Sequence, residues 1–201
     1  MCCRMLPSDC KHRQPTGKQL PFAMATNSPF YTYVSPGEGY EDAPPLPNEL
    51  DEDGKSLKNP LREGLSKAYE IFPVPLDNGH RGGFDVHIYH FQNNPEQVKY
   101  AKNLWERIRR EFPELRIYRF WEKPVGPHPV AMFEVNLFTP AQFGAFVPWL
   151  AIYRGPLSVL IHPNTTEEGF DHNATELRNH TQRAIWMGER LPLDTSIFYR
   201  T

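Results

Sequence analysis

The hydrophobic and polar positions divide the chain near residue 84. Beyond that point, apolar side chains either alternate with polar ones or recur at helical spacing, which are the periods of strands and helices. Before that point no such period persists. We therefore predict a mostly disordered or loosely draped N-terminal region at 1–83 and one folded domain at 84–201.

The folded part follows the order strand, helix, strand, strand, helix, strand. The strands are 84–91, 115–121, 130–138 and 157–163, and the helices run from the capping residue Asn94 to Phe112 and from Thr139 to Gly155. Pro148 is expected to kink or split the second helix, because its ring clashes with the preceding turn. This βαββαβ order predicts an α+β, ferredoxin-like fold, with an antiparallel sheet in the order 4-1-3-2 and both helices on one face. The remaining residues, 164–201, are expected to add an acidic loop, a helix at 173–186 and an extended tail.

Proline content and charge explain why the N-terminal region is predicted to be disordered. Eleven of the 21 prolines precede residue 84, and residues 24–83 carry ten acidic and five basic side chains. Such a segment buries too little apolar surface to offset its chain entropy, although "REGLSKAYEIF" is suited to a short helix or turn of contact. Residues 1–23 have no apolar run of signal-peptide length, and Met24 is a second candidate start.

The composition excludes several classes of protein. A formal net charge of −2 is too balanced for a protein that binds nucleic acid through its overall field, and the basic aromatic motif of RNA-recognition domains is absent. No stretch approaches the roughly 20 apolar residues of a membrane span. All three cysteines lie in the first ten residues, so the core is built without disulfides and a cytoplasmic location is favoured.

Strand alternation assigns the polar side chains to one face of the predicted sheet. In the first strand Asp85, His87 and Tyr89 point away from the helices, whereas Val86, Ile88 and His90 point toward them. By the same alternation, Glu134 of the third strand and His162 of the fourth belong to the open face. His87, Glu134 and His162 are therefore expected on one face of three adjacent strands.

The order in which the strands end predicts that a further histidine, His128, lies near the open face. With the third strand taken as parallel to the first and the fourth as antiparallel to it, the hairpin that contains His128 lies beside His87 and His162. Three convergent imidazoles suit iron, zinc, copper or nickel. The spacing alone fits structural roles better, with His128 stabilising a turn bracketed by prolines and His162 ending a strand.

Long blocks of this sequence resemble the DOPA 4,5-dioxygenase family of fungi and bacteria. The blocks are "FDVHIYH", "FPELRIY", "KPVGPHPVAMFEVNLFTPAQFGAFVPWL", "RGPLSVLIHPNT" and "WMGERLPLD". The resemblance runs from about Gly82 to Phe198, so that it covers the predicted domain and not the first 80 residues.

The resemblance implies a non-haem Fe(II) enzyme that uses O₂ to open a catechol ring beside its two hydroxyls. Its substrate class would be catechols such as L-DOPA, cleaved to seco-DOPA, which cyclises to betalamic acid, or to muscaflavin after 2,3-cleavage. The histidine blocks of the family fall on His87, His128 and His162 as metal ligands, and His180 matches a family histidine suited to acid–base catalysis. Bacterial relatives tend to have His-x-His in the first strand, where this chain has Asp85, which favours His87 as the ligand.

Other residues are candidates for binding the substrate. Tyr89 is a candidate for lining the catechol pocket, and Arg119 and Arg154 for holding a substrate carboxylate, although packing and solvated roles are commoner for such residues. Glu134 is a candidate fourth or alternative ligand, which would give a triad of two histidines and one carboxylate, or a partner beside the site.

Two rival interpretations belong to other classes. One is a non-catalytic ligand-binding or dimerisation module that uses the open face of the sheet. The other is a different metal-dependent enzyme on the same scaffold, such as a zinc hydrolase. Either a homodimer or the C-terminal tail would cover the open face, and the sequence does not choose between them.

Overall fold

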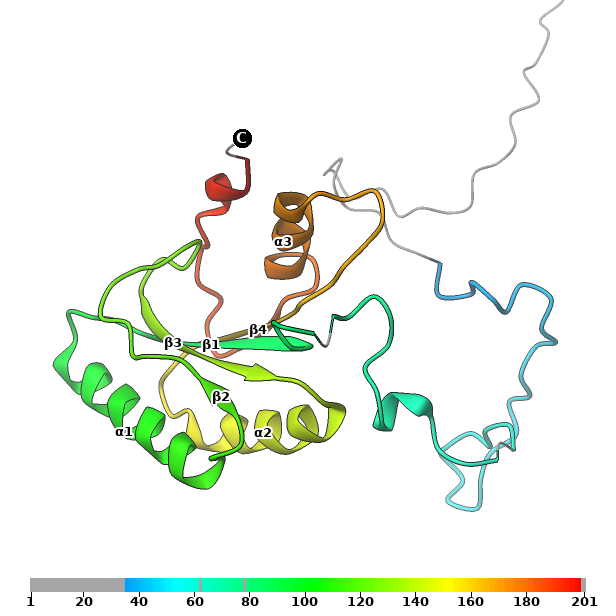
Figure 1. Cartoon of the computed structure of the whole chain (residues 1–201). Coiled ribbons are helices and arrows are strands. Elements are labelled where there is room, and N and C mark those ends of the chain that lie inside the picture. The colour runs from blue at the N-terminus through cyan, green and yellow to red at the C-terminus, as the bar shows by residue number, and fades with distance from the viewer. Residues whose placement is uncertain (1–34, 62, 78, 200–201) are drawn as a thin grey trace, which may run out of the picture. The chain divides into compact units, whose positions relative to one another are not determined.

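The computed structural model describes residues 35–61, 63–77 and 79–199 (Figure 1). The predictions for the three cysteines, for a start at Met24 and for disorder over 1–34 lie outside these residues. Contacts within the chain separate two units, Met1–Pro45 and Leu46–Thr201. Of the first unit, the described residues 35–45 hold turns, and every element that positions the site belongs to the second unit.

A five-stranded antiparallel sheet forms the centre of the second unit. Its strands are β1 (Phe84–His90), β2 (Arg116–Ile117), β3 (Ala131–Leu137), β4 (Val159–Pro163) and β5 (Ile185–Met187). The spatial order is β2-β3-β1-β4-β5, which confirms the predicted order of the first four strands and adds β5 beside β4. The second strand is shorter than predicted, although the backbone N–H groups of Tyr118 and Trp121 still donate to the carbonyls of Glu134 and Met132 on β3.

The direction expected for the third strand is wrong. β3 runs antiparallel to β1, with Phe84 opposite Leu137 and His90 opposite Ala131. The reason is topological: the helical crossover makes the second strand parallel to the first, and the hairpin that follows reverses the chain. The loop that contains His128 therefore joins the sheet beside the end of β1, not beside its start.

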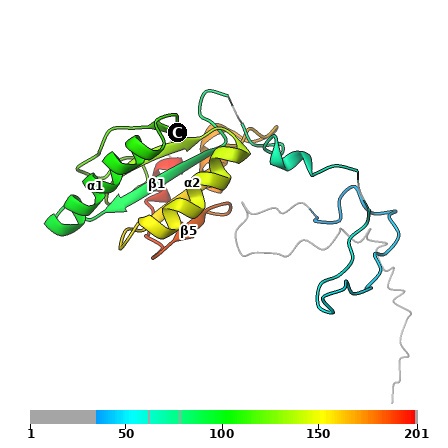
Figure 2. The ribbon, with the colours of Figure 1, turned by 90° about the horizontal axis from the view of Figure 1, so that it is seen from below.

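Two helices, α1 (Pro95–Glu111) and α2 (Pro140–Tyr153), cover one face of the sheet (Figures 1 and 2). Both begin as predicted: the Asn94 side chain accepts from the backbone N–H of Gln97, and that of Thr139 accepts from Gln142, each followed by proline at the first helical position. These caps satisfy backbone donors that the helices leave unpaired.

Pro148 does not split α2, which continues unbroken to Tyr153. A proline removes the hydrogen bond to the carbonyl four residues earlier and crowds that carbonyl. Here that residue is Gly144, which is exposed, and a Cβ added to it would meet nothing within 4 Å, so that the helix is not crowded at this position.

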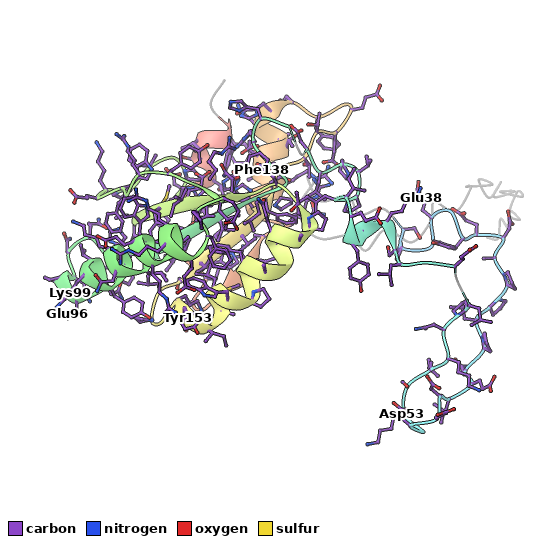
Figure 3. The ribbon with its side chains drawn as sticks, turned by 60° about the horizontal axis from the view of Figure 1, so that its bottom comes forward. Glu38, Asp53, Glu96, Lys99, Phe138 and Tyr153 are labelled. Carbon is purple, nitrogen blue, oxygen red and sulfur yellow. The ribbon has the colours of Figure 1, made fainter. Side chains whose placement is uncertain are left out.

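The core fills the space between α1, α2 and the sheet, as the side chains in Figure 3 show. Val86, Ile88 and Phe133 are fully buried there, together with Val135 of β3 and with Val159 and Ile161 of β4. A smaller apolar cluster, which includes Tyr89, Met132 and Leu160, lies on the other face. The face assignments made from strand alternation are therefore confirmed.

The chain after β4 forms the second face of the molecule. α3 (His172–His180) lies over the open face of the sheet, together with the C-terminal 3₁₀ helix η2 (Thr195–Tyr199) (Figure 1). The predicted helix at 173–186 ends six residues early, because Trp186 and its neighbours pair with β4 as β5. Within the described residues, no helix is long and apolar enough to cross a membrane.

The segment before β1 contacts the core. The short helix predicted in it is present as η1 (Lys67–Tyr69), and the Phe72 ring packs against Phe84 and Phe143. Further along, the backbone N–H of Asp77 donates to the carbonyl of Asn164, just beyond β4. Arg81, a few residues further on, is bound to α3 over the open face, where it donates two hydrogen bonds to the carboxylate of Glu176.

Candidate functional site

Three buried histidines meet above the open face of the sheet. His87 belongs to β1, His162 to β4 and His180 to the last turn of α3, and each offers a ring nitrogen within 4.8 Å of the other two. In the ladder between β1 and β4, His162 pairs with Asp85, which makes it a diagonal neighbour of His87 on the same face. The group therefore depends on two adjacent strands and on the helix that lies over them.

Backbone carbonyls determine which nitrogen carries the proton in two of these rings. The Nδ1 atom of His162 lies 3.1 Å from the carbonyl of Pro163, and that of His180 lies 2.9 Å from the carbonyl of Glu176. A carbonyl oxygen only accepts hydrogen bonds, so each Nδ1 is the donor. Nε2 of both rings therefore carries a lone pair rather than a proton, which is the form that binds a metal.

The environment of His87 shows that the group suits a cation. Its Nε2 atom lies 3.0 Å from Nε2 of His162, and its buried Nδ1 atom has no hydrogen-bond partner within the described part of the chain. That Nδ1 faces Oε2 of Glu134 at 3.9 Å. A cation between the rings would use the Nε2 lone pairs and leave Nδ1–H of His87 directed at the carboxylate, as is common for metal-ligating histidines.

Burial keeps these imidazoles neutral. It lowers the pKa of His162 and of His180 to about 3, and it holds the pKa of His87 well below its usual range. The neighbouring imidazoles act in the same direction, because a second positive charge close by is unfavourable. At neutral pH the group therefore presents uncharged ligands.

His128 lies beside this group, in the loop that leads into β3. Its ring centroid is 4.1 Å from that of His87, and its Nδ1 atom is 2.8 Å from the hydroxyl of Tyr89. The loop is fixed over the open face where the backbone N–H of Asp194 donates to the carbonyl of Pro127. His128 thus approaches His87, as the sequence predicts, by folding back over the sheet rather than through a parallel third strand. It is not one of the three residues that offer ligand atoms within 4.8 Å of one another.

A carboxylate pair adjoins the histidines. The side-chain amide of Asn136 donates to Oδ1 of Asp85 at 2.6 Å and to Oε1 of Glu134 at 2.7 Å. Burial raises the pKa of Asp85 to about 7, and the negative charge of Glu134 adds to this shift. Burial also raises the pKa of Glu134 itself. Arg116 in turn donates from Nε to Oδ1 of Asn136. The chain thus holds Glu134 beside His87 through an amide that both carboxyl groups share.

A cavity of about 590 Å³ opens over the histidines. All four histidines described above line it, with Arg81, Arg116, Glu134 and Glu176 among the charged side chains. Arg81 makes two hydrogen bonds to the carboxylate of Glu176, at 2.9 and 3.2 Å. The Phe198 ring of η2 lies 5.3 Å from that of His180 and closes part of the cavity with an apolar surface.

The structure places the other predicted binding residues away from this cavity. The guanidinium of Arg119 lies 3.7 Å from the centroid of the Trp121 ring, and Arg154 donates to the carbonyl of Leu157. Tyr89 is buried beneath His128 and does not line the cavity.

Two arginines that do line the cavity, Arg81 and Arg116, were not among the predicted residues. Arg81 falls in the segment predicted to be draped. The sequence contains one signal for Arg81, which is the pair of glycines, Gly82 and Gly83, that follows it directly. In the structure the backbone N–H of Gly83 donates to the carbonyl of Leu137 on β3.

Comparison with known proteins gives this constellation a family. The model of the Dopa 4,5-dioxygenase family matches residues 84–197, which is more than half of the chain and contains all four histidines. The chain belongs to the Dopa 4,5-dioxygenase family. We therefore interpret the buried histidine group and the polar cavity beside it as features of a member of this family.

Several proteins are similar to this chain in sequence. An uncharacterised 21.2 kDa protein of Botryotinia fuckeliana is 68% identical over 85% of this chain and 92% of its own. The DOPA 4,5-dioxygenase of Amanita muscaria is 35% identical over 54% of this chain, a match that spans 46% of that enzyme. A provisionally named dioxygenase from Nostoc punctiforme, known from a crystal structure, is 29% identical over 61% of this chain and 95% of its own, with a TM-score of 0.46.

Proposed function

We propose that this protein is a non-haem iron(II) extradiol dioxygenase that uses O₂ to open the ring of a catechol such as L-DOPA. The observation that carries the proposal is the group of three buried, uncharged histidines at a cavity of about 590 Å³ in a member of this family. A cavity of this size is within the roughly 300–1,000 Å³ of small-molecule sites. Cleavage at the 4,5 bond would give a seco product that cyclises to betalamic acid.

His87, His162 and His180 are the residues that would hold the metal. This set keeps two of the ligands expected from the sequence and replaces His128 with His180, whose Nε2 lone pair is free. Three protein ligands leave positions open for substrates, and iron bound there would favour the deprotonated catechol and bring O₂ next to the ring. Glu134 lies beside His87 and is proposed to orient that ring, not to bind the metal.

Charged side chains in the wall of the cavity support a substrate that carries a carboxylate and an ammonium group. Arg81 and Arg116 line it, and we assign to them the carboxylate-binding role first considered for Arg119 and Arg154. Glu176, which is paired with Arg81, also lines the cavity and supplies a negative charge for an ammonium group. Ile197 and Phe198 exclude water from the side of the cavity that η2 covers.

Oxygen uptake by the full chain tests the proposal. The metal-free protein is loaded anaerobically with Fe(II) and then mixed with aerated L-DOPA, dopamine or catechol. We expect one O₂ consumed per ring opened, a new visible absorption band with L-DOPA, and weaker activity with dopamine, which lacks the carboxylate. Fe(II)-loaded protein that takes up no O₂ with any of the three catechols would exclude this function.

The rival functions give different results in the same experiment. A zinc hydrolase would consume no O₂ and would instead cleave an ester when loaded with Zn(II), whereas a non-catalytic binding module would hold no iron and show no turnover. His162→Asn is expected to lose turnover. His90→Gln is the matched control, because His90 lies on the helix-covered face and glutamine can keep its hydrogen bond to the carbonyl of Trp121.

A further inference from the structure

His128 differs from the other three histidines in what contacts its Nδ1 atom. In His162 and His180 that atom faces a backbone carbonyl, whereas in His128 it faces the hydroxyl of Tyr89 at 2.8 Å. Both partners of this hydrogen bond are buried. The Tyr89 ring is held in place by stacking on Trp186, with centroids 5.8 Å apart and an angle of 16° between the rings.

The direction of this hydrogen bond follows from the surroundings of Tyr89. Within the described residues the hydroxyl has no partner other than His128. If Nδ1 of His128 were the donor, the hydroxyl proton would be buried without an acceptor, which is unfavourable. Tyr89 therefore donates to Nδ1, and the proton of the neutral His128 ring lies on Nε2.

The three rings whose Nδ1 atoms have a hydrogen-bond partner thus fall into two chemical classes. His162 and His180 have a lone pair on Nε2, whereas His128 has a proton there. A protonated ring nitrogen cannot bind a metal, but it can donate a hydrogen bond. His128 lines the cavity, and its Nε2 atom has no protein partner in the described part of the chain.

We propose that His128 is a hydrogen-bond donor to an anionic oxygen of the bound substrate and not a metal ligand, and that Tyr89 is the positioning residue that keeps its proton on Nε2. The inference rests on the proposed function, because a deprotonated catechol oxygen is the acceptor that it names. It reverses the roles that the sequence suggested for His128 and His180.

Zinc affinity separates a ligand from a donor without any need for turnover. Zn(II) is titrated against a chromophoric chelator in the native protein and in His128→Asn and His180→Asn. Asparagine at 128 can still accept from Tyr89 but has no group at the Nε2 position, so Zn(II) affinity should stay close to native. His180→Asn should weaken it at least about 100-fold. Equal losses in the two variants would overturn the proposal, even if the iron-loaded enzyme opens catechols.

Long-range ¹H–¹⁵N spectra of the Zn(II)-loaded protein report which nitrogen of each ring carries the proton. We expect Nε2–H for His128 in the native protein, and exchange between both tautomers in Tyr89→Phe. Tyr100→Phe is the matched control, because the Tyr100 hydroxyl donates to the carbonyl of Tyr153, away from the site. A native His128 with its proton on Nδ1 would refute the assignment.

Steady-state kinetics then test what the donor does. Removing one donor to a developing or bound anion costs about 10²–10³ in kcat, so His128→Asn should lose that much, with a smaller change in KM. His128→Gln, which places an amide donor near the Nε2 position, should recover part of the loss. An unchanged kcat in His128→Asn, in protein that opens catechols, would show that His128 has no contact with the reacting oxygen.

Discussion

The two faces of the sheet are built from alternating residues of the same strands, and they differ in the polar groups that they bury. Toward α1 and α2, side chains such as Val86 and Ile161 are fully buried among other apolar groups. Toward α3, their neighbours His87 and His162 are equally buried but have polar partners or none. One face therefore stabilises the fold through apolar burial, and the other holds polar groups whose burial is unfavourable without a partner.

The difference shows where metal binding would act. On the open face the buried Nδ1 atom of His87 has no hydrogen-bond partner within the described residues, and the Nε2 atoms of His87 and His162 face each other at 3.0 Å. A bound cation would relieve this arrangement and stabilise the folded state by mass action. Substitutions on the two faces should therefore affect different measurements.

The largest expected effect is that of His162→Ala. Removal of one of the three proposed ligands should abolish metal binding and catechol turnover, both measurable on one preparation by metal analysis and oxygen uptake. The metal-free variant should unfold at a denaturant concentration close to that of the metal-free native protein, because the residue contributes little apolar burial. Full activity in this variant would remove His162 from the site.

Ile161→Ala tests the same strand one residue earlier, on the opposite face. Ile161 is fully buried in the main core, so the free energy of unfolding should fall by about 2–5 kcal/mol in a urea titration. Metal affinity of the folded fraction should be close to native. A large loss of metal affinity with unchanged stability would contradict the division of roles between the two faces.

Regular periodicity explains what could be predicted from the sequence. Alternation along β1, β3 and β4 assigned Ile88 and His87 to their faces, and Asn94 and Thr139 identified the two helix starts, because these signals are local. The predicted interaction of His87 with His162 followed from adjacent strands on one face.

The parts that could not be predicted depend on contacts between distant segments. Whether His128 or His180 completes the group of three is determined by a loop that folds back over the sheet and by the length of α3, and neither has a period. β5 is only three residues long, and its pairing with β4 is visible only in the assembled sheet. Arg81 reaches the cavity because the segment before β1 packs against the core, despite a composition typical of disorder.

Glu134→Gln tests whether the open face orients its histidines through charge. The carboxylate lies 3.9 Å from Nδ1 of His87, and glutamine keeps an oxygen that can accept from Asn136. Loss of a carboxylate partner of a ligating histidine typically costs about 10–100-fold in metal affinity, which the chelator titration measures. Native affinity in this variant would mean that His87 is oriented by packing alone.

The smallest expected effect concerns how α3 is held over the open face. Glu167, in the loop before α3, accepts hydrogen bonds from Arg183 at 2.8 and 2.9 Å and forms an ion pair with Arg178 at 3.2 Å. These arginines, Arg183 foremost, hold the pKa of Glu167 below its usual range. A lowered pKa in the folded state means that the contribution to stability is present above the pKa of the unfolded chain and is lost as the pH falls through that of the folded protein.

We therefore expect Glu167→Gln to lower the free energy of unfolding at pH 7 by about 0.5–1 kcal/mol, a range set by partial solvent screening of the pair. Urea titrations at several pH values should show the difference between native and variant protein shrinking as the pH falls below about 4, near the ordinary pKa of a glutamate. The same difference at every pH would assign the effect to lost packing rather than to charge. Ile161→Ala provides the contrast between the two faces, because an apolar cavity costs stability at acidic and neutral pH alike.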